Sequence, residues 1–228
     1  MCGIYGSRDF KSFKNLYTAN CHRGNFAGGS IYIRAKDGMY IKKWKGVIPP
    51  SSFDEESAFA SDFHTFLGHT QAPTGAMRAF KYNTTHPFEH GDWIVAHNGV
   101  LENDQDIREQ IKPSDNLTFN TLDVPVDSAV IPALIHEQYI DEDVPAIASA
   151  LEMLKGTFGC WFYNKKTQQT YIARSGSTLF ANIETGCFSS ISTTSVSCSL
   201  DQGKIYCITP EGLTVVGEFK YDSPFFVF

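Results

Sequence analysis

The spacing of the apolar residues changes twice along this chain of 228 residues, and that change restricts its fold more than any other feature. Short apolar runs typical of strands occupy the first part of the chain at 2–7, 30–36, 39–47, 65–71 and 92–100. A helical spacing follows, and strand-like runs return at 157–164, 170–176, 186–193, 204–210 and 213–219. This order favours packed antiparallel sheets with helices outside them, an α+β fold.

Two amphipathic helices are predicted in the middle of the chain. Apolar residues recur at i, i+3, i+4, i+7 and i+8 over 126–134, and a similar stripe runs over 144–154. Gly156 is expected to end the second helix as its C-cap residue. The run from Phe158 to Tyr163 is apolar on both faces, which is typical of a strand buried between two layers.

Composition limits the classes of protein to consider. Hydrophobic residues make up 42% of the chain and charged residues 19%, which suits one domain over 1–228 without a linker. The net charge is -6 and the basic residues are scattered, so binding to nucleic acid is not expected. No run approaches the roughly 20 apolar residues that cross a bilayer, and the start does not resemble a secretion signal. We therefore expect a cytoplasmic protein with no membrane partner.

The chain has six cysteines without a CxxC pair, at Cys2, Cys21, Cys160, Cys187, Cys198 and Cys207. Most of them lie in apolar runs, so buried and reduced thiols are expected for all except Cys2. Cys2 follows Met1, and its small size predicts that Met1 is removed. The α-amino group titrates near ~7.7–8.0 and would then lie on the same residue as the thiol, where it can accept the thiol proton.

Further segments contain residues suited to a site around such a nucleophile: "CHRGNFAGG" at 21–29, "GHTQAPTG" at 68–75 and "HPFEHGDWIVAHNGVLEND" at 86–104. In the last segment a strand is expected to end at His97, before Asn98 and Gly99. The Asn98 side-chain amide and the Gly99 N–H could converge as two neutral donors, which a tetrahedral oxyanion requires. In isolation, an Asn-Gly pair is better explained as an ordinary type I′ turn.

Together, and in this order, these segments resemble the class II glutamine amidotransferases. The shared features are an N-terminal Cys-Gly-Ile, an Arg-Gly turn, a Gly-His-Thr strand and a His-Asn-Gly segment, with an acidic residue on a following helix. The resemblance spans nearly the whole chain. It implies a four-layer α/β/β/α sandwich of two antiparallel sheets, of the N-terminal-nucleophile hydrolase type.

The resemblance also implies roles for individual residues. Cys2 matches the nucleophile, and Asn98 with Gly99 matches the oxyanion hole. Arg23 matches the arginine of a turn near the nucleophile, with a structural or positioning role toward the substrate site.

Substrate-binding residues follow from the same resemblance. Thr74 and Gly75 match the segment that lines the glutamine site. Asp127, at the start of the first predicted helix, matches the acid that holds the α-ammonium group of the substrate. An acid in the first turn of a helix is also common because it interacts favourably with the helix dipole.

The chain departs from the family at Gln71, where the family usually has an arginine that binds the α-carboxylate of glutamine. An uncharged amide loses that bidentate contact, which corresponds to about 1.5–3 kcal/mol and to binding weaker by one to two orders of magnitude. Three explanations stay open. Arg78 supplies the cation, glutamine binding is weak, or the substrate lacks a free α-carboxylate.

No metal or cofactor is expected. His86 and His90 have the spacing of half a metal site, but Pro87 interrupts any helix through them and no third ligand has a matching spacing. The sequence also contains no Gly-rich phosphate-binding loop.

The function implied by the resemblance is that of a glutaminase. Cys2 would attack the side-chain amide of glutamine, form a γ-glutamyl thioester, and release ammonia and glutamate. The activity that would use the ammonia is expected either to be absent or to reside on a separate synthase subunit. Two alternatives remain: an amidohydrolase that cleaves another γ-glutamyl compound, and a non-catalytic relative that acts as a binding module.

Overall fold

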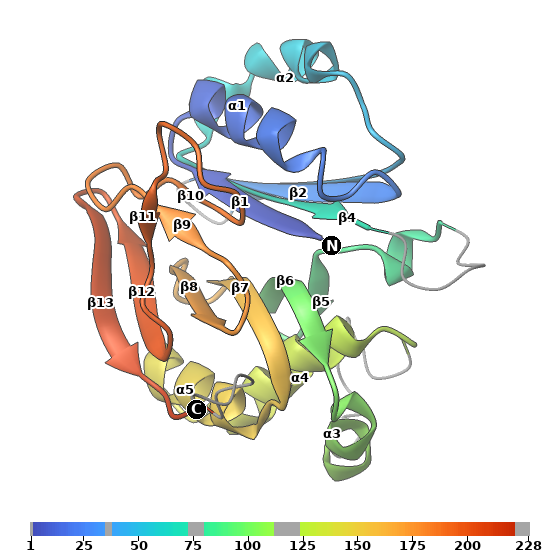
Figure 1. The fold of residues 1–228 in the computed structure, drawn as a ribbon, viewed down its shortest axis with the longest axis vertical. Helices are drawn as coiled ribbons and strands as arrows, with labels where there is room; N and C mark the ends of the chain where they lie inside the picture. Colours follow the sequence, from blue (N-terminus) through green and yellow to red (C-terminus); the bar gives the residue numbers. More distant parts are fainter. Residues whose placement is uncertain (1, 35–37, 73–79, 112–123, 222–228) are drawn as a thin grey trace, which may run out of the picture.

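The strands form two antiparallel sheets that lie face to face in the computed structural model, which describes residues 2–34, 38–72, 80–111 and 124–221 (Figure 1). Helices cover the outer side of each sheet, with α1 and α2 on one and α4 and α5 on the other. The predicted α+β fold and its four-layer α/β/β/α arrangement are confirmed.

The first sheet has the strand order β11-β9-β10-β1-β4-β2-β3. Its strands are β1 (Gly3–Ser7), β2 (Ala27–Arg34), β3 (Gly38–Lys45), β4 (Thr65–Gln71), β9 (Phe180–Ala181), β10 (Phe188–Ser189) and β11 (Cys198–Ser199). Because β1 lies between β4 and β10, the strand that follows Cys2 is paired on both sides.

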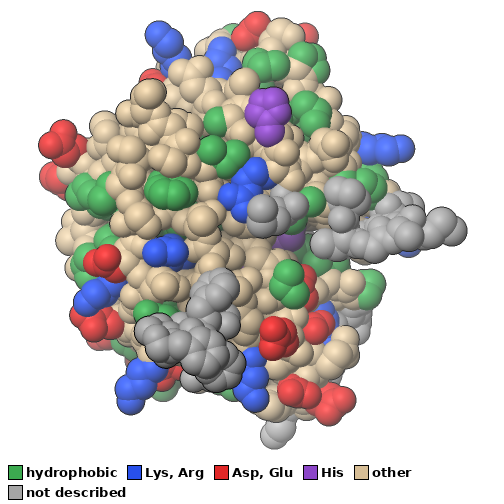
Figure 2. Space-filling model, in the orientation of Figure 1, with side chains coloured by type: hydrophobic (Ala, Val, Ile, Leu, Met, Phe, Trp, Pro, Cys, Tyr) green, Lys and Arg blue, Asp and Glu red, His purple; other side chains and the backbone are tan. Residues whose placement is uncertain are grey.

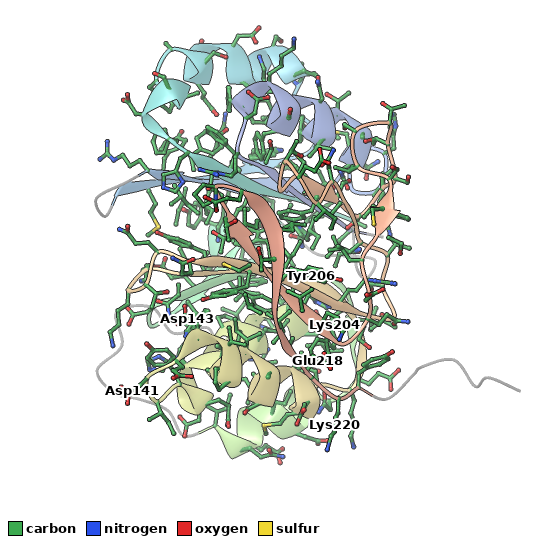
Figure 3. The ribbon with its side chains drawn as sticks, turned by 90° about the vertical axis from the view of Figure 1, so that its left-hand side faces the viewer. Asp141, Asp143, Lys204, Tyr206, Glu218 and Lys220 are labelled. Atoms are coloured by element: carbon green, nitrogen blue, oxygen red, sulfur yellow. The ribbon has the colours of Figure 1, made fainter. Side chains whose placement is uncertain are left out.

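The second sheet has the order β13-β12-β8-β7-β6-β5. Its strands are β5 (Phe88–His90), β6 (Trp93–Leu101), β7 (Gly156–Asn164), β8 (Thr170–Ser175), β12 (Lys204–Thr209) and β13 (Gly212–Glu218). At its edge, Lys204 on β12 forms an ion pair with Glu218 on β13, as Figure 3 shows. This pair is solvent-exposed, so it contributes little to stability.

The helices lie on the outer faces of the sheets. On the first sheet these are α1 (Phe10–Asn20), η1 (Pro50–Phe53), α2 (Asp54–Ser57) and η2 (Ala60–Asp62). On the second they are α3 (Asp104–Gln110), η4 (Asp127–Ala129), α4 (Val130–Gln138) and α5 (Asp143–Met153), and the short helix η3 (Tyr82–Thr84) precedes β5.

Helix α1 was not predicted, because only strands were expected in the first third of the chain. It begins after Asp9, whose side chain accepts a hydrogen bond from the Ser12 N–H at 2.6 Å and caps the helix. Its inner face buries Phe13, Leu16 and Tyr17 against the first sheet.

The core between the sheets is mainly apolar, and buried polar contacts also join the two sheets. Ile4 and Leu67 from the first sheet pack with Ile94 and Trp161 from the second. The indole N–H of Trp161 donates to the Gly68 carbonyl oxygen across the two sheets at 3.1 Å. Every second residue of a strand faces the same side of its sheet. Polar residues that lie two positions from these buried residues therefore also face the space between the sheets.

Two local predictions were wrong. Asn98 and Gly99 do not form a turn after a strand; they lie within β6 and pair with Gly159 and Phe158 of β7. Gly156 does not cap α5, which ends at Met153, and instead begins β7. In both places, pairing between β6 and β7 outweighs the local preference of the glycine.

All six cysteines are free thiols, but their burial is not uniform. Cys160, Cys187 and Cys207 are buried as expected, whereas Cys198 is exposed and Cys21 is partly exposed. On the face shown in Figure 2, lysine and arginine side chains are dispersed among acidic ones. Within the described ranges, no helix has both the length and the apolar character required to span a bilayer.

The contact between Trp161 and Gly68 gives a test of how the sheets are held together. Trp161→Phe should lower the free energy of unfolding by about 1–3 kcal/mol, because it removes the buried hydrogen bond to the Gly68 carbonyl and shrinks a completely buried ring. Urea unfolding followed by circular dichroism measures this change. Val216→Ala on β13, where the side chain is 40% exposed, is the control and should change stability by less than about 0.5 kcal/mol. An equal loss of stability in both variants would contradict a stabilising role for the contact between Trp161 and Gly68.

Candidate active site

Cys2 lies directly before β1, on the side of the first sheet that faces the second sheet. The pairing of Gly3 with Thr70 places Cys2 next in register to Gln71 at the end of β4. Ile4, two residues further on, packs into the core between the sheets, so the Cys2 side chain points the same way. The Ala72 N–H donates a hydrogen bond to Cys2 Sγ at 3.4 Å.

The surroundings of Cys2 favour the neutral thiol. Burial raises the pKa of the Cys2 thiol above its ordinary value, and the negative charge of Asp127 acts in the same direction. The Ala72 N–H, the positively charged chain terminus and the Arg23 guanidinium lower that pKa but do not outweigh burial. A thiol in this position requires a base before it can act as a nucleophile.

The Asn98 side chain approaches from the opposite sheet. Asn98 lies on β6 and is 3% exposed, and its Nδ2 donates to Ser190 Oγ at 3.1 Å. The same Ser190 Oγ accepts a hydrogen bond from the Ile4 N–H at 3.0 Å. One serine oxygen therefore joins the amide of Asn98 to the strand that carries Cys2. Sequence reasoning did not identify Ser190, which belongs to none of the motifs.

Gly99 has a backbone conformation that other residues rarely adopt. Its φ is +154°, and a Cβ at this position would collide with the Thr157 carbonyl oxygen on the neighbouring strand. The glycine is therefore required by the close approach of β7 at this point of β6.

Arg23 lies in the turn after α1 and contacts the segment that follows β10. Its Nη1 donates to the Ser190 carbonyl oxygen at 2.8 Å and to Thr178 Oγ1 at 3.1 Å. Gly24 allows this turn, because a Cβ there would lie 2.6–2.7 Å from backbone atoms of Thr70 and Gln71. Burial lowers the pKa of Arg23.

Asp127 begins η4, directly before α4. Its Oδ2 accepts the Leu101 N–H at 3.0 Å, and its Oδ1 accepts the Ser128 N–H at 2.8 Å. These contacts fix the carboxylate at the end of β6 and agree with an acid that stabilises the start of a helix. A carboxylate has about four lone-pair sites, so two backbone contacts leave acceptor capacity for a cationic ligand group.

A buried histidine controls the hydroxyl group next to that carboxylate. His97 Nε2 donates to the Thr157 carbonyl oxygen at 3.2 Å, and Nδ1 lies 2.8 Å from Ser128 Oγ. Burial lowers the pKa of His97 although Asp127 opposes this, which favours the neutral ring. The Thr157 carbonyl oxygen can only accept a hydrogen bond, so the proton of the neutral ring is on Nε2. Nδ1 then accepts the Ser128 hydroxyl proton, although Ser128 Oγ also lies 3.1 Å from Asp127 Oδ1.

Gln71 is almost fully buried beside Cys2. The residue is 2% exposed, and its Oε1 accepts no hydrogen bond from the described part of the chain. A buried carbonyl oxygen without a partner carries a desolvation cost, which a donor on a ligand would remove. The other predicted substrate-binding residues, Thr74, Gly75 and Arg78, lie outside the described residues.

The histidines that resembled half a metal site point to different neighbours. His86 stacks on His69 with ring centroids 3.8 Å apart, whereas His90 lies 5.5 Å from His136. His69 Nε2 donates to the His97 carbonyl oxygen at 3.1 Å, and burial lowers the pKa of His69 to about 3. Among the described residues, no three His, Cys, Asp or Glu side chains are grouped as metal ligands.

Two solved structures have a similar fold. The glutamine phosphoribosylpyrophosphate amidotransferase from B. subtilis matches with a TM-score of 0.73 at 18% identity, covering 95% of this chain and 49% of that chain. A glutamine aminotransferase class-II domain protein from Silicibacter pomeroyi matches with a TM-score of 0.59 at 16% identity, covering 96% and 99% of the two chains. The chain therefore has the fold that these two proteins share.

Sequence comparison agrees with this fold. A family model described as a glutamine amidotransferase domain matches residues 82–192. The glutamine–fructose-6-phosphate aminotransferase (isomerizing) of Oceanobacillus iheyensis is 25% identical over 193 residues, which cover 82% of this chain and 31% of that protein. The chain thus spans about a third of the length of this curated relative. The predicted resemblance to the glutamine amidotransferases is confirmed, and residues 82–192 match a domain of that family.

Burial of Cys2 gives a testable pH dependence. With an N-terminal tag left in place, alkylation of Cys2 by iodoacetamide should increase with pH through a midpoint above the ordinary thiol value of 9.0. The thiolate is the reactive form, and a raised pKa keeps the thiol protonated to higher pH. Peptide mass spectrometry measures the modification, with the exposed Cys198 followed in the same sample. A midpoint below 9.0 would show that burial does not dominate.

Proposed function

We propose that this chain hydrolyses the side-chain amide of glutamine, with Cys2 as the nucleophile. The observation that carries the proposal is the contact of Asn98 Nδ2 and the Ile4 N–H with one serine oxygen, Ser190 Oγ. This contact supports an oxyanion-binding amide held next to the strand of the nucleophile. The charge of Asp127, which acts on the thiol, supports a position for the substrate α-ammonium group in the same site.

The proposed reaction has two steps. After removal of Met1, the α-amine of Cys2 accepts the thiol proton, and Sγ forms a bond to the amide carbon of the substrate. The oxyanion receives hydrogen bonds from Asn98 and Gly99, and the protonated amine donates to the departing nitrogen, so the C–N bond breaks and ammonia leaves. Water then attacks the γ-glutamyl thioester, with the same amine as base, and glutamate and the free thiol are released.

Transfer of the ammonia is a further part of the proposal. The sequence resemblance leads us to expect an acceptor on a separate synthase subunit. The Oceanobacillus relative is named for its action on fructose 6-phosphate, and this chain matches 31% of its length. The identity of an acceptor therefore does not follow from that name.

Replacing the nucleophile tests the main proposal. Trimmed protein incubated with glutamine should release glutamate and ammonia in equal amounts, and Cys2→Ser should lower this turnover by at least about a thousandfold. A retained N-terminal extension should also abolish turnover, because the α-amine is then no longer on Cys2. Cys198→Ser, an exposed thiol, is the matched control and should have no effect. Full turnover by Cys2→Ser would end the proposal.

A second candidate substrate is supported by Gln71. Its buried Oε1 suits a ligand that donates a hydrogen bond, and it does not suit the acceptor oxygens of a carboxylate. A γ-glutamyl amide in which the α-carboxylate is replaced by a neutral amide would provide such a donor. The probes that separate the two substrates are glutamine and its α-amide, glutaminamide.

Gln71→Arg tests how the substrate meets this position. If the α-carboxylate of glutamine lies here, the new arginine should lower the KM for glutamine by roughly one to two orders of magnitude. Gln71→Met, similar in size but uncharged, is the control. If the wild-type protein instead turns over glutaminamide faster, the second candidate holds and Gln71→Arg should reverse that preference.

Arg78 is the other candidate for a positive charge that binds the α-carboxylate of glutamine. If Arg78 has this role, Arg78→Ala raises the KM for glutamine, and Gln71→Arg changes it little. An unchanged KM in both variants would show that neither residue binds the α-carboxylate.

A further inference from the structure

We infer that Ser190 is a positioning residue that holds the Asn98 amide in the orientation needed to bind the oxyanion. The inference rests on the proposed function and adds a residue to it. Ser190 lies directly after β10, next to β1, and is completely buried. Its side chain is on the face of the first sheet that looks toward β6, because it reaches Asn98 on that strand.

The backbone of Ser190 is fixed independently of its side chain. Its N–H donates to the Ile4 carbonyl oxygen at 2.8 Å, which continues the pairing of β10 with β1. Its carbonyl oxygen accepts hydrogen bonds from Arg23 Nη1 at 2.8 Å and from Thr178 Oγ1 at 2.9 Å. By holding the backbone of Ser190, Arg23 therefore contributes indirectly to the position of the Asn98 amide.

The Oγ of Ser190 determines which way the Asn98 amide faces. Oγ accepts the Ile4 N–H at 3.0 Å and one Nδ2 hydrogen of Asn98 at 3.1 Å. An amide nitrogen has two hydrogens, so the second Nδ2 hydrogen stays available for the oxyanion. Without the serine oxygen, rotation about the terminal side-chain bond could turn the carbonyl oxygen of Asn98 toward that position, where it would repel the oxyanion.

This role predicts an effect on the chemical step. The oxyanion exists only in the tetrahedral states, so losing the correct amide orientation should lower kcat and change KM little. Loss of one oxyanion donor costs a factor of about 10²–10³ in kcat. Removing its anchor should cost less, and we expect a loss of about 10- to 100-fold.

The neighbouring Ser189 provides a matched control. It is also completely buried, and its Oγ accepts one backbone N–H, from Ile191 at 3.0 Å, and one asparagine Nδ2, from Asn20 at 2.8 Å. Its contacts therefore repeat those of Ser190 in kind, but they lie on the opposite face of the strand, next to α1. Ser189→Ala removes equivalent hydrogen bonds without touching Asn98.

The experiment compares Ser190→Ala, Ser189→Ala and wild-type protein with two readouts. Glutamine turnover passes through an oxyanion, whereas alkylation of Cys2 by iodoacetamide is a displacement without one. Ser190→Ala should lower kcat about 10- to 100-fold and leave the alkylation rate within about twofold. Ser189→Ala should leave both rates near those of the wild type. In an Asn98→Ala background, Ser190→Ala should cause little further loss, because both substitutions remove the same function.

Several results would overturn the inference. They are an equal kcat for the two serine variants, a parallel loss of alkylation in Ser190→Ala, or fully multiplicative effects with Asn98→Ala. If Ser190→Ala does not fold, Ser190→Cys replaces the oxygen by a weakly accepting sulfur of similar size and is used in the same assays. An inactive wild-type protein that is still alkylated at Cys2 would instead count against the proposed function.

Discussion

The pairing of β1 with strands on both of its sides is the constraint on which the site depends. β4 and β10 fix β1 along both edges, so Cys2 stays in register with the end of β4. Register also determines direction, since a shift by one residue would turn the thiol to the side of α1. The end of a central strand thus supplies a fixed position for a residue that lies next to the chain terminus, where backbone order is otherwise weakest.

The second sheet completes the site because both sheets present polar residues to the space between them. An uncompensated polar group in such a space costs free energy, and the contact between Asn98 and Ser190 removes that cost while joining the sheets. On the outer side of β6, the hydrogen bond between His97 and Ser128 beside Asp127 likewise gives buried polar groups a partner. Alternation along β6 therefore separates the Asn98 side chain, which faces the first sheet, from the His97 side chain beside Asp127.

Local sequence patterns predicted most strands but not the features that depend on distant contacts. The apolar runs of β4, β6 and β7 are short and rich in β-branched or aromatic residues, which is typical of buried strands. Helix α1 was missed although its buried residues recur at helical spacing after Asp9, because the aromatic residues among them also suit strands. Ser190 gave no signal, since its partners lie 92 and 186 residues away in the sequence. Asn98 and Gly99 did give a signal, but pairing with β7 overrides the turn that their local preference favours.

The protonation states of the buried histidines restrict which group can activate Cys2. Burial lowers the pKa of His69 to about 3, and a base that weak accepts few protons from a thiol near neutral pH. His97 is also kept neutral by burial, and both of its ring nitrogens are within hydrogen-bond distance of Ser128 and Thr157. Burial raises the thiol pKa at the same time, so the need for a base is greater than for an exposed cysteine. An ordinary α-amine titrates near ~7.7–8.0, a range that suits a base at neutral pH better than the lowered pKa values of the two histidines do. Under the proposed mechanism, the burial that keeps the Cys2 thiol protonated therefore favours the α-amine of Cys2 over either histidine as the base.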